Sequence, residues 1–426
     1  GLGDVYKRQK IGWFAMSKLI VIGSGIVGLA CAWAAQKEGW TITLVDRDFA
    51  GDRTSHGNAG GIGTSECLPL TLSGLGWKPL KWLADPLGPL SIRWQYVPRL
   101  LPWALQLQKV GKSQNYLRIA TALNNLNQRA LADFKEMMVD IGAADEVHEA
   151  GALLVYETEE AFQADQVSIN LKRSLGVRLR EVRKAELLEL EPNLAPVFER
   201  ALMIEDWCHV NDPKAIVDRL RATIESRGAK LVEATALRLD VSQKFPSVAL
   251  ENGSIITGDK VVVAAGVWAT KLAASIGDRL LIESERGYNT TLPASAKLLN
   301  REVIFAEAMF VATPLTLGLR IGGAAEFAGI DAAPNFQRSD ALLKLSRKYL
   351  PSADSTDQKQ WMGHRPSTPD SLPIIGVSSK SDTVIYACGH GHLGLTQSAT
   401  TAKLVSSILV NRLPEVDITP YAANRF

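Results

Sequence analysis

The segment Gly-Ser-Gly-Ile-Val-Gly at residues 23–28 constrains the fold of this chain more than any other feature of its sequence. A β-branched run at residues 19–22 precedes it, and an alanine-rich stretch with helical character at residues 26–37 follows it. In a strand–turn–helix unit of this kind, the glycines permit a tight turn, close approach of a pyrophosphate, and close packing of helix on strand. The helix N-terminus also presents unpaired N–H groups and the positive end of its dipole to phosphates. The segment therefore predicts a dinucleotide site.

An acidic residue follows the next strand. Residues 41–45 form a second buried run, and Asp46 stands directly after it. A carboxylate there can accept hydrogen bonds from ribose hydroxyls and would repel a 2′-phosphate, although the neighbouring Arg47 weakens the second argument. A glycine turn without a nucleotide is the alternative interpretation, and these residues alone do not separate FAD from NAD. The residues expected to contact the dinucleotide are Gly23, Gly25, Ile26, Val27, Gly28, Asp46 and Arg47.

The length and charge of the chain exclude several classes of protein. At 426 residues it is too long for one compact core, so we expect two closely joined domains. A net charge of +2 without a basic run gives no support for nucleic-acid binding. No run approaches the roughly 18 apolar residues of a membrane-spanning helix, so we expect a soluble or peripheral protein. The cysteines lack the spacing of a zinc site or a disulfide frame, which predicts reduced thiols in a cytoplasmic protein: Cys31, Cys67, Cys208 and Cys388.

The N-terminal residues 1–15 lack the apolar region and the cleavage site of a secretory signal. Met16 directly precedes the first strand, so we interpret it as the native start of the protein. The residues before Met16 are accordingly interpreted as appended, and residues 1–16 are expected to be a non-native or disordered tail that takes no part in the fold.

Strands and helices alternate along the rest of the chain. Strands are expected at residues 230–241, 260–264, 303–321 and 383–387, and helices at 115–141, 212–227, 339–350 and 394–410. The nucleotide-binding signals lie at the N-terminus, near residue 265 and at the C-terminus, so a second domain must be inserted between them. This order predicts an α/β fold with a discontinuous dinucleotide-binding domain at residues 17–95, 205–275 and 345–426, and a substrate-binding domain at 96–204 and 276–344.

Four further segments carry a resemblance to a known family. They are SHGNAGGI at residues 55–62, VVVAAGVWA at 261–269, GHRPSTPDSLPIIG at 363–376 and CGHGHLGLTQS at 388–398. Together they resemble the D-amino-acid oxidase superfamily, and most closely its D-amino acid dehydrogenase branch, which includes enzymes acting on D-proline and D-hydroxyproline. The resemblance extends from Ser17 to the C-terminus, although the middle of the chain matches only loosely. It implies an FAD-binding Rossmann-like domain interleaved with a substrate domain built on an antiparallel sheet.

The resemblance also implies which residues contact the flavin. The loop at residues 55–61 would run along the isoalloxazine ring, because small residues and backbone N–H groups can approach a planar ring closely. Some relatives attach the flavin to a histidine in this loop, but their motif differs from SHGNAGG, so non-covalent FAD is expected. The residues so implied are Ser55, His56, Asn58, Ala59, Gly60, Gly61, Ala265, Gly266, Trp268, Gly391, His392, Leu393, Gly394 and Thr396.

Arg365 stands where relatives such as glycine oxidase carry the arginine that binds the substrate carboxylate. A guanidinium suits this task because its planar fork binds a carboxylate in bidentate fashion. The alternative is a structural salt bridge to Asp370. Tyr288 matches a tyrosine that assists carboxylate binding in the family, although a buried core tyrosine is an equal alternative. We expect Arg320 to be structural.

His390 and His392 flank Gly391 near the expected flavin edge, where they could contact substrate or flavin or serve as structural histidines. Neither has an acidic neighbour at the spacing of metal ligands, so no metal site is predicted.

These features favour oxidative deamination of a D-amino or D-imino acid by hydride transfer from Cα to FAD, with electrons passed to a quinone or another carrier. One alternative is a glycine- or sarcosine-type oxidase that uses O₂, and another is a flavin-binding subunit without catalysis of its own.

Residues 77–107 combine four tryptophans with basic residues and prolines. This segment is either an insertion packed on the substrate domain or a peripheral surface for the inner face of the cytoplasmic membrane, contacting it through short turns. The oligomeric state is left open.

Overall fold

The computed structural model describes residues 17–71, 85 and 87–426. The expected N-terminal tail lies outside these residues, as do Trp77 and Trp82 of the tryptophan-rich segment. Within the described part of the chain, no helix is long and apolar enough to cross a membrane.

A six-stranded sheet forms one half of the molecule. Its order is β10 (Lys230–Glu233), β2 (Thr41–Asp46), β1 (Lys18–Ile22), β14 (Lys260–Val263), β21 (Val384–Cys388) and β20 (Ile374–Val377). The first five strands are parallel, and β20 is antiparallel to β21. The predicted Rossmann-like sheet is therefore present, and it joins the two ends of the chain with its middle.

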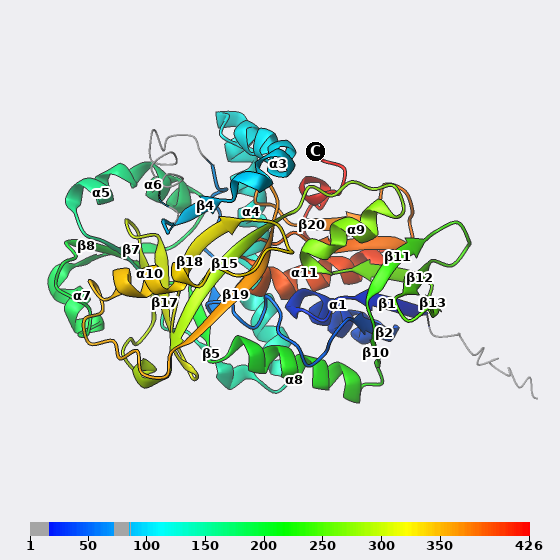
Figure 1. The fold of residues 1–426 in the computed structure, drawn as a ribbon, viewed down its shortest axis with the longest axis horizontal. Coiled ribbons are helices and arrows are strands. Elements are labelled where there is room, and N and C mark those ends of the chain that lie inside the picture. Colours follow the sequence, from blue (N-terminus) through cyan, green and yellow to red (C-terminus); the bar gives the residue numbers. More distant parts are fainter. Residues whose placement is uncertain (1–16, 72–84, 86) are drawn as a thin grey trace, which may run out of the picture.

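Alternation along β1 directs its side chains into two different cores. Leu19 and Val21 pack with α1 (Ile26–Lys37), α4 (Ser113–Asp140), α8 (Pro213–Ser226) and α11 (Gly394–Leu409). Ile20 and Ile22 face the opposite way, toward the small sheet β11 (Ala236–Asp240), β12 (Ser247–Leu250) and β13 (Ile255–Thr257), and toward α9 (Ala269–Ala274). The six-stranded sheet is thus covered on both faces (Figure 1), as a parallel sheet requires.

A nine-stranded sheet forms the other half. Along its path lie β19 (Lys359–Ser367), β15 (Glu283–Leu292), β18 (Gly318–Phe327), β17 (Phe310–Leu315), β16 (Glu302–Phe305), β6 (Ala152–Tyr156), β8 (Arg200–Ile204) and β7 (Leu179–Arg183), while β4 (Leu90–Ile92) pairs with β18. Most pairs are antiparallel, and β16–β6 and β18–β4 are parallel. The helices of this half are α5 (Glu159–Ala164), α6 (Gln166–Ser174), α7 (Lys184–Leu190) and α10 (Gln337–Ser346). A separate three-stranded sheet holds β3 (Gly61–Ile62), β9 (Cys208–Val210) and β5 (Val147–His148).

Most predicted elements form where the sequence places them, and two differ. The single strand expected at residues 230–241 is two strands in different sheets, because the chain turns after β10 has paired with β2. The helix expected at residues 339–350 begins at Gln337 and ends at Ser346. The N-cap of α8 is Asp212, whose carboxylate accepts the Lys214 N–H at 2.8 Å.

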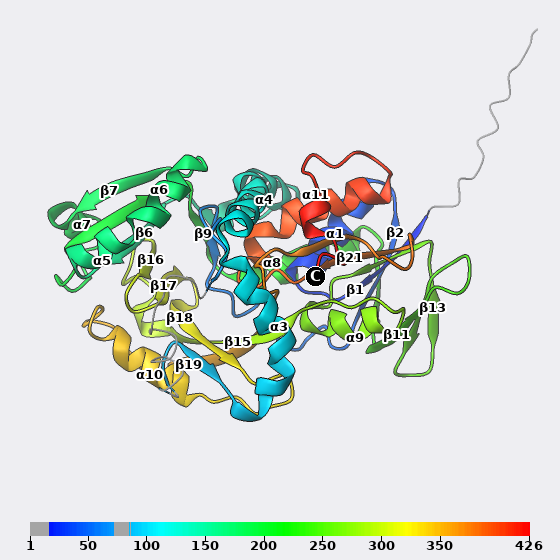
Figure 2. The same cartoon turned by 90° about the horizontal axis from the view of Figure 1, so that it is seen from above.

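The second half of the tryptophan-rich segment is helical, contrary to the expectation of short turns. The 14-residue helix α3 (Val97–Val110) tolerates Pro98 because the first turn needs no N–H donor there, and it carries Pro102 in its interior. Leu100, Trp103 and Val110 are its buried residues. In Figure 2, α3 and α4 lie where the two halves of the molecule meet.

The division into two interleaved domains remains a proposal. Two strands whose residues fall inside the ranges expected for the FAD-binding domain, β4 and β19, belong to the nine-stranded sheet. Conversely, α4 falls inside the range of the substrate domain but packs in the core beside α1 and α11.

Candidate functional site

The glycine turn after β1 is shaped by contacts that only glycine permits. Gly23 has a φ of +107°, and a Cβ there would lie 2.5 Å from the carbonyl oxygen of Ala264. A Cβ on Gly28 would lie 2.0 Å from the carbonyl oxygen of Gly23. A Cβ on Gly25 would meet only Ser55 Oγ, at 3.4 Å. Gly23 and Gly28 are therefore required by the protein itself, whereas Gly25 keeps the start of α1 open to a ligand.

The end of β2 lies beside this turn. Asp46 Oδ2 accepts a 2.6 Å hydrogen bond from the Ser24 N–H, which fixes the carboxylate next to the glycines. The guanidinium of Arg47 lies 4.0 Å from the ring centre of Trp268. The predicted contact residues that follow β2 and β14 are therefore brought together.

Arg53 is a candidate cofactor residue that sequence reasoning missed. Its Nη1 donates a 2.8 Å hydrogen bond to the carbonyl oxygen of Ser24 and contacts the hydroxyl of the same residue. Its Nη2 donates to the carbonyl oxygen of Asp48 at 2.6 Å. The cation thus stands at the glycine turn, where a pyrophosphate carries negative charge. The sequence contains a signal for this role, because Arg53 is the only Lys or Arg in residues 48–77.

The loop predicted to follow the flavin is held from the nine-stranded sheet. Arg320 Nη1 donates hydrogen bonds to the carbonyl oxygens of His56 at 3.1 Å and Asn58 at 2.6 Å. Asn289 Nδ2 donates to the carbonyl oxygen of Gly57 at 2.8 Å. Arg320 is buried and lies in the sheet face that meets the loop, as expected of a structural residue.

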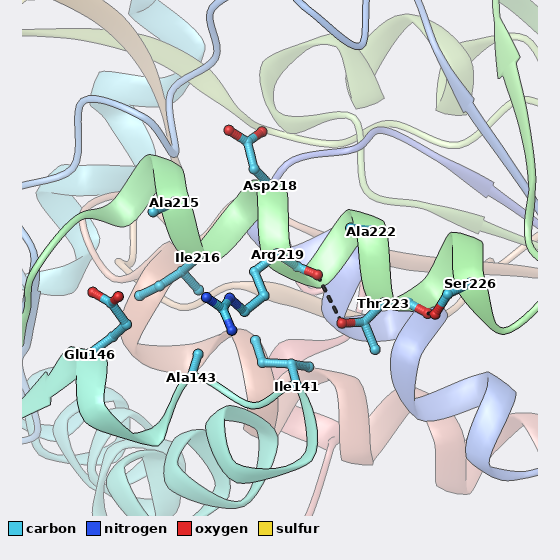
Figure 3. Close-up of a pocket in the computed structure, with 10 residues that line it drawn as sticks. All are labelled: Ile141, Ala143, Glu146, Ala215, Ile216, Asp218, Arg219, Ala222, Thr223 and Ser226. Carbon is cyan, nitrogen blue, oxygen red and sulfur yellow. Dashed lines mark hydrogen bonds between the residues drawn. The ribbon is translucent and has the colours of Figure 1, made fainter.

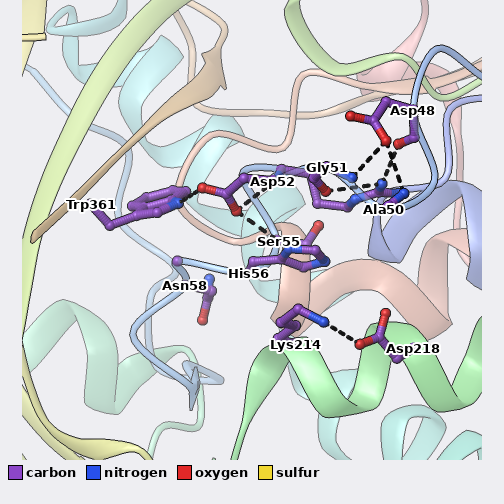
Figure 4. Close-up of polar contacts among 12 residues, drawn as sticks. Asp48, Ala50, Gly51, Asp52, Ser55, His56, Asn58, Lys214, Asp218 and Trp361 are labelled. Carbon is purple, nitrogen blue, oxygen red and sulfur yellow. Dashed lines mark hydrogen bonds and ion pairs between the residues drawn. The ribbon is translucent and has the colours of Figure 1, made fainter. Parts of the chain in front are cut away.

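The same loop is braced by Asp52 and Trp361 (Figure 4). Asp52 Oδ1 lies 3.3 Å from His56 Nδ1, and its other oxygen accepts a hydrogen bond from the indole of Trp361. Further along the chain, the Gly63 N–H donates to Thr396 Oγ1 of α11 at 2.9 Å. The predicted residues at 55–61 and at 391–396 therefore belong to one contiguous region.

Unpartnered polar atoms in this region fit a heteroaromatic cofactor. His56 Nε2 and Asn289 Oδ1 are buried and have no hydrogen-bond partner among the described residues. Buried polar groups normally find a partner, so each marks a place where a ligand atom with hydrogen-bonding capacity would be stabilised. Together with the open start of α1 and the cation at Arg53, these atoms fit a dinucleotide whose ring system extends along the loop.

The turn before α11 approaches β19. The Gly391 N–H donates to the carbonyl oxygen of Pro366 at 2.9 Å, and Gly391 has a φ of +52°. His390 is buried, with its Nε2 2.9 Å from Thr401 Oγ1. Burial lowers the pKa of His390 to about 3, so its ring is neutral near pH 7. These contacts place His390 inside the protein and leave His392 as the histidine that faces the site.

Arg365 pairs with Glu285 and not with Asp370. Arg365 Nη1 lies 2.9 Å from Glu285 Oε1, and the two residues face each other across the β19–β15 pair. A Cβ on Gly287 would lie within 2.5 Å of the Arg365 guanidinium, so this glycine lets the cation rest flat on β15. Asp370 is instead held by Arg425 at 2.8 Å, and the salt bridge considered from the sequence is therefore wrong.

Glu285 gathers three donors from two segments, β19 and the turn before α11. Besides Arg365, it meets His392 Nε2 at 2.8 Å and accepts a hydrogen bond from Ser367 Oγ at 2.9 Å. Burial alone would raise the pKa of this carboxyl, but the charges of His392 and Arg365 outweigh burial and hold the pKa well below its usual range. Glu285 is thus an ionised, buried carboxylate beside the expected carboxylate-binding arginine.

Tyr288 does not join this cluster. In the β15–β19 register it faces Met362, whereas Arg365 faces Glu285, so the two side chains point to opposite faces of the sheet. The Tyr288 hydroxyl donates to Glu326 Oε2 at 2.5 Å and accepts the Asn335 N–H at 3.1 Å. This position matches the core tyrosine that was the alternative, and it gives no support for carboxylate binding by Tyr288.

A surface pocket lies elsewhere, between α8 and residues 141–146 (Figure 3). None of its lining residues belongs to the predicted site. No group of three or more His, Cys, Asp or Glu side chains that could hold a metal ion occurs in the described residues.

Comparison with known proteins places this site in a family. The model of the FAD dependent oxidoreductase family matches residues 18–408. The chain belongs to this family. It is 34% identical to a D-amino-acid oxidase of Bradyrhizobium diazoefficiens, over 95% of this chain and 98% of that protein. It is 27% identical to a D-amino acid dehydrogenase of Rhizobium johnstonii, over 96% and 100% of the respective chains. The structure resembles that of glycine oxidase from Geobacillus kaustophilus, with a TM-score of 0.76, 19% identity, and coverage of 96% and 100%.

These findings confirm the family resemblance, the fold class, the assignment as an oxidoreductase, and FAD as its cofactor. As an FAD-dependent oxidoreductase, the protein would hold the pyrophosphate at Gly23–Gly28 and Arg53, and the ring system along residues 55–61. The assignment of individual contact residues, and of non-covalent attachment, remains a prediction.

Proposed function

We propose that this FAD-dependent oxidoreductase oxidises a D-amino or D-imino acid at Cα, and that Arg365 binds the substrate carboxylate. FAD, when bound, supplies the two-electron acceptor for the hydride. The imino acid that forms from a primary amine would then hydrolyse to a 2-oxo acid and ammonia. The proposal rests on one observation above all. Arg365 lies on the sheet face that contacts both the loop at residues 55–61 and the turn at 391–394.

The residues on this face have tasks that follow from their chemistry. Arg365 offers a planar fork of donors for a carboxylate. Gly287 and Gly363 have no side chains that would project from the strands into this space. Trp361 packs over Gly363 and against Gly57. A substrate held between this surface and the loop would be fixed in position and shielded from water, which is the main contribution that a protein makes when its cofactor carries the chemistry. The names of the two curated relatives support an amino acid of D configuration as the substrate.

The electron acceptor is proposed to be a quinone, reached from a membrane surface at α3. Residues 86–132 contain no Asp or Glu but include Arg93, Arg99, Lys109, Lys112, Arg118 and Arg129. On α3 and just before it, Trp94 is 78% exposed, Leu101 54% and Leu105 53%. Exposed apolar side chains among cations suit the headgroup region of an anionic bilayer. The opposite side of α3 contacts β19, the strand that carries Arg365, because Trp103 Nε1 donates to the carbonyl oxygen of Ser367 at 3.0 Å.

Oxidation by O₂ is the second candidate, because the relative with the higher identity is named an oxidase. Stopped-flow mixing of the holoenzyme with a panel of D- and L-amino acids under anaerobic conditions tests the reaction itself. We expect bleaching of the flavin band by D-amino or D-imino acids, and an unchanged spectrum across the panel would favour a subunit without catalysis. Measuring peroxide yield against reduction of a soluble quinone analogue then identifies the acceptor.

Membrane contact can be tested separately by co-sedimentation with vesicles. The wild type should bind vesicles containing anionic lipid at low salt and dissociate as salt is raised. Replacing both Trp94 and Leu101 by serine should release the protein from the vesicles. Replacing the exposed Leu413 by serine should not, because Leu413 lies outside residues 86–132. A wild type that stays in the supernatant would refute this part of the proposal.

A further inference from the structure

Glu285 poses a question that the proposed function leaves open. A buried carboxylate directly beside the carboxylate-binding arginine would repel the carboxylate of a substrate, and its Oε1 lies 2.9 Å from Arg365 Nη1. Removing a charge from water is costly unless the charge is paired. A chain that keeps an ionised glutamate at this place therefore needs it either to neutralise Arg365 or to bind a positive group of the ligand.

The hydrogen bonds of Glu285 leave room for one more donor. An ionised carboxylate offers about four acceptor positions, and Glu285 uses three of them for Arg365, His392 and Ser367. Arg365 contacts Glu285 through Nη1, while a guanidinium carries five donors, so other donors can face a substrate carboxylate. Arg365 and His392 both contact Oε1, so the position that remains lies on Oε2, which carries only the bond from Ser367. His392 is 48% exposed, so this cluster borders the solvent side of the site.

The spacing of the pair selects the amino group on Cα over a basic side chain. In an α-amino acid the nitrogen and the carboxyl carbon are attached to the same carbon atom. A ligand whose carboxylate is held by Arg365 therefore carries its α-nitrogen close to the neighbouring Glu285. An amine at the end of a long side chain would reach well past both residues.

From this geometry we infer that Glu285 binds the α-amino group of the substrate, so that Arg365 and Glu285 together select zwitterionic amino acids that carry at least one N–H. This inference rests on the proposed function and specifies its substrate class. Primary amines and a cyclic secondary amine such as D-proline meet the requirement. Carboxylic acids that lack the amine are disfavoured, because their single negative charge faces Glu285 without compensation.

Matched ligands and one substitution test the inference in the holoenzyme. D-Alanine is compared with propionate, which lacks the amino group, and D-proline with cyclopentanecarboxylate, in which a methylene group replaces the ring N–H. Binding is followed by the change in flavin absorbance under anaerobic conditions, and KM and kcat are measured for the amino acids. In Glu285→Gln we expect KM for the amino acids to rise about 10- to 100-fold, the range for loss of a hydrogen bond to a charged group. Propionate and cyclopentanecarboxylate should bind several-fold more tightly, because Arg365 no longer faces an anion.

Glu283→Gln is the matched control. Glu283 lies two residues before Glu285 on the same face of β15, but its carboxylate accepts a 2.6 Å hydrogen bond from Tyr96 and contacts a different region. This variant should leave both ligand classes unchanged. If Glu285→Gln does not fold, Glu285→Asp keeps the charge and shortens the side chain. It should weaken amino acids while leaving the amine-free acids as weak as in the wild type.

The outcomes separate this inference from the proposed reaction. Parallel weakening of both ligand classes in Glu285→Gln would reduce Glu285 to a structural residue and overturn the inference, and so would unchanged binding of both. If no amino acid reduces the wild-type flavin but the substitution still reverses the preference between D-alanine and propionate, the reaction is wrong and the recognition role stands. If D-amino acids are oxidised and no reversal occurs, the reaction stands and the recognition role fails.

Discussion

Arg320 Nη1 donates a 2.6 Å hydrogen bond to the backbone carbonyl oxygen of Asn58. The same nitrogen serves the carbonyl oxygen of His56, and Arg320 Nε donates to Thr291 Oγ1 at 3.1 Å. A buried cation of the nine-stranded sheet therefore fixes the loop that the flavin is expected to follow. The Nε and Nη1 donors of Arg320 are therefore used in structure, which agrees with the structural role expected from the sequence.

Arg320→Met should weaken FAD binding about 5- to 100-fold, because two buried carbonyl groups lose their donor at a cost of about 1–3 kcal/mol. The FAD dissociation constant, measured by fluorescence after removal and return of the cofactor, checks this. Arg347→Met, at the exposed end of α10, is the control and should bind FAD as the wild type does. Unchanged affinity in Arg320→Met would show that the loop is ordered by other contacts.

Two glycines of the turn should respond differently to alanine. A Cβ at Gly28 meets backbone at 2.0 Å, so Gly28→Ala should give insoluble or unfolded protein. A Cβ at Gly25 meets only a side-chain oxygen at 3.4 Å, so Gly25→Ala should fold but lose most of its FAD, since the added methyl stands where the pyrophosphate approaches. Circular dichroism and the ratio of flavin to protein absorbance separate the two results. Full flavin content in Gly25→Ala would contradict the placement of the pyrophosphate.

The sequence predicts elements whose signals are local. The start of α1 follows from the glycine turn that precedes it. The start of α8 follows from Asp212 at the N-cap and Pro213 at the first helical position. The prolines near α3 predicted short turns, but the segment is helical. Pro98 falls in the first turn of the helix, where it costs little, and the burial of Leu100 and Trp103 offsets the cost of Pro102 in the interior.

Contacts between distant residues could not be predicted in the same way. Glu285 and Arg365 are 80 positions apart and meet only because of the β15–β19 register. The same register turns Tyr288 to the opposite face, and a shift by one residue would have reversed both results. Asp370 is five residues from Arg365, yet it pairs with Arg425. Sequence proximity suggested the wrong partner because strand direction decides which side chains meet.

Arg365→Ala should retain FAD but lose about 10²- to 10³-fold in kcat/KM, mainly through KM, since a charge-assisted contact with the substrate is removed. Arg365→Lys should recover little, because a point charge cannot replace the planar fork. Steady-state kinetics with the best substrate of the panel measures both. Arg425→Ala breaks the ion pair with Asp370 and is a fitting control, which should lower the melting temperature without raising KM. Near-wild-type kinetics in Arg365→Ala would move carboxylate binding to another residue.

Tyr288→Phe should affect stability and not catalysis. Burial and the hydrogen bond to Glu326 raise the pKa of Tyr288, so its hydroxyl remains a neutral donor beneath the sheet. Loss of this bond should cost about 1–2 kcal/mol of unfolding free energy and leave kcat/KM within a few-fold of the wild type. Denaturant unfolding and kinetics on the same preparation provide the comparison. A large rise in KM with unchanged stability would restore Tyr288 to the substrate site.

Glu302 gives the protein a pH dependence of its own. Its side chain is buried, Trp207 Nε1 donates to its Oε2 at 3.1 Å, and a Cβ on Gly61 would lie 2.3 Å from the same oxygen. Burial raises the pKa of Glu302 to about 8, against 4.5 for the exposed group. The folded protein therefore keeps a proton that the unfolded chain has lost between these values. The stability that Glu302 contributes is fully present below pH 4.5 and is lost as the pH rises toward 8.

Glu302→Gln removes this titration while keeping an acceptor for Trp207. The difference in unfolding free energy, variant minus wild type, should increase by about 1.4 kcal/mol per pH unit between about pH 5 and 7.5. Denaturant unfolding at several pH values, with excess FAD in every sample, measures this difference. The exposed carboxylate of Glu251 lies outside the site, and Glu251→Gln should show no such slope. A difference that stays constant from pH 5 to 8 would mean that Glu302 is ionised in the folded protein.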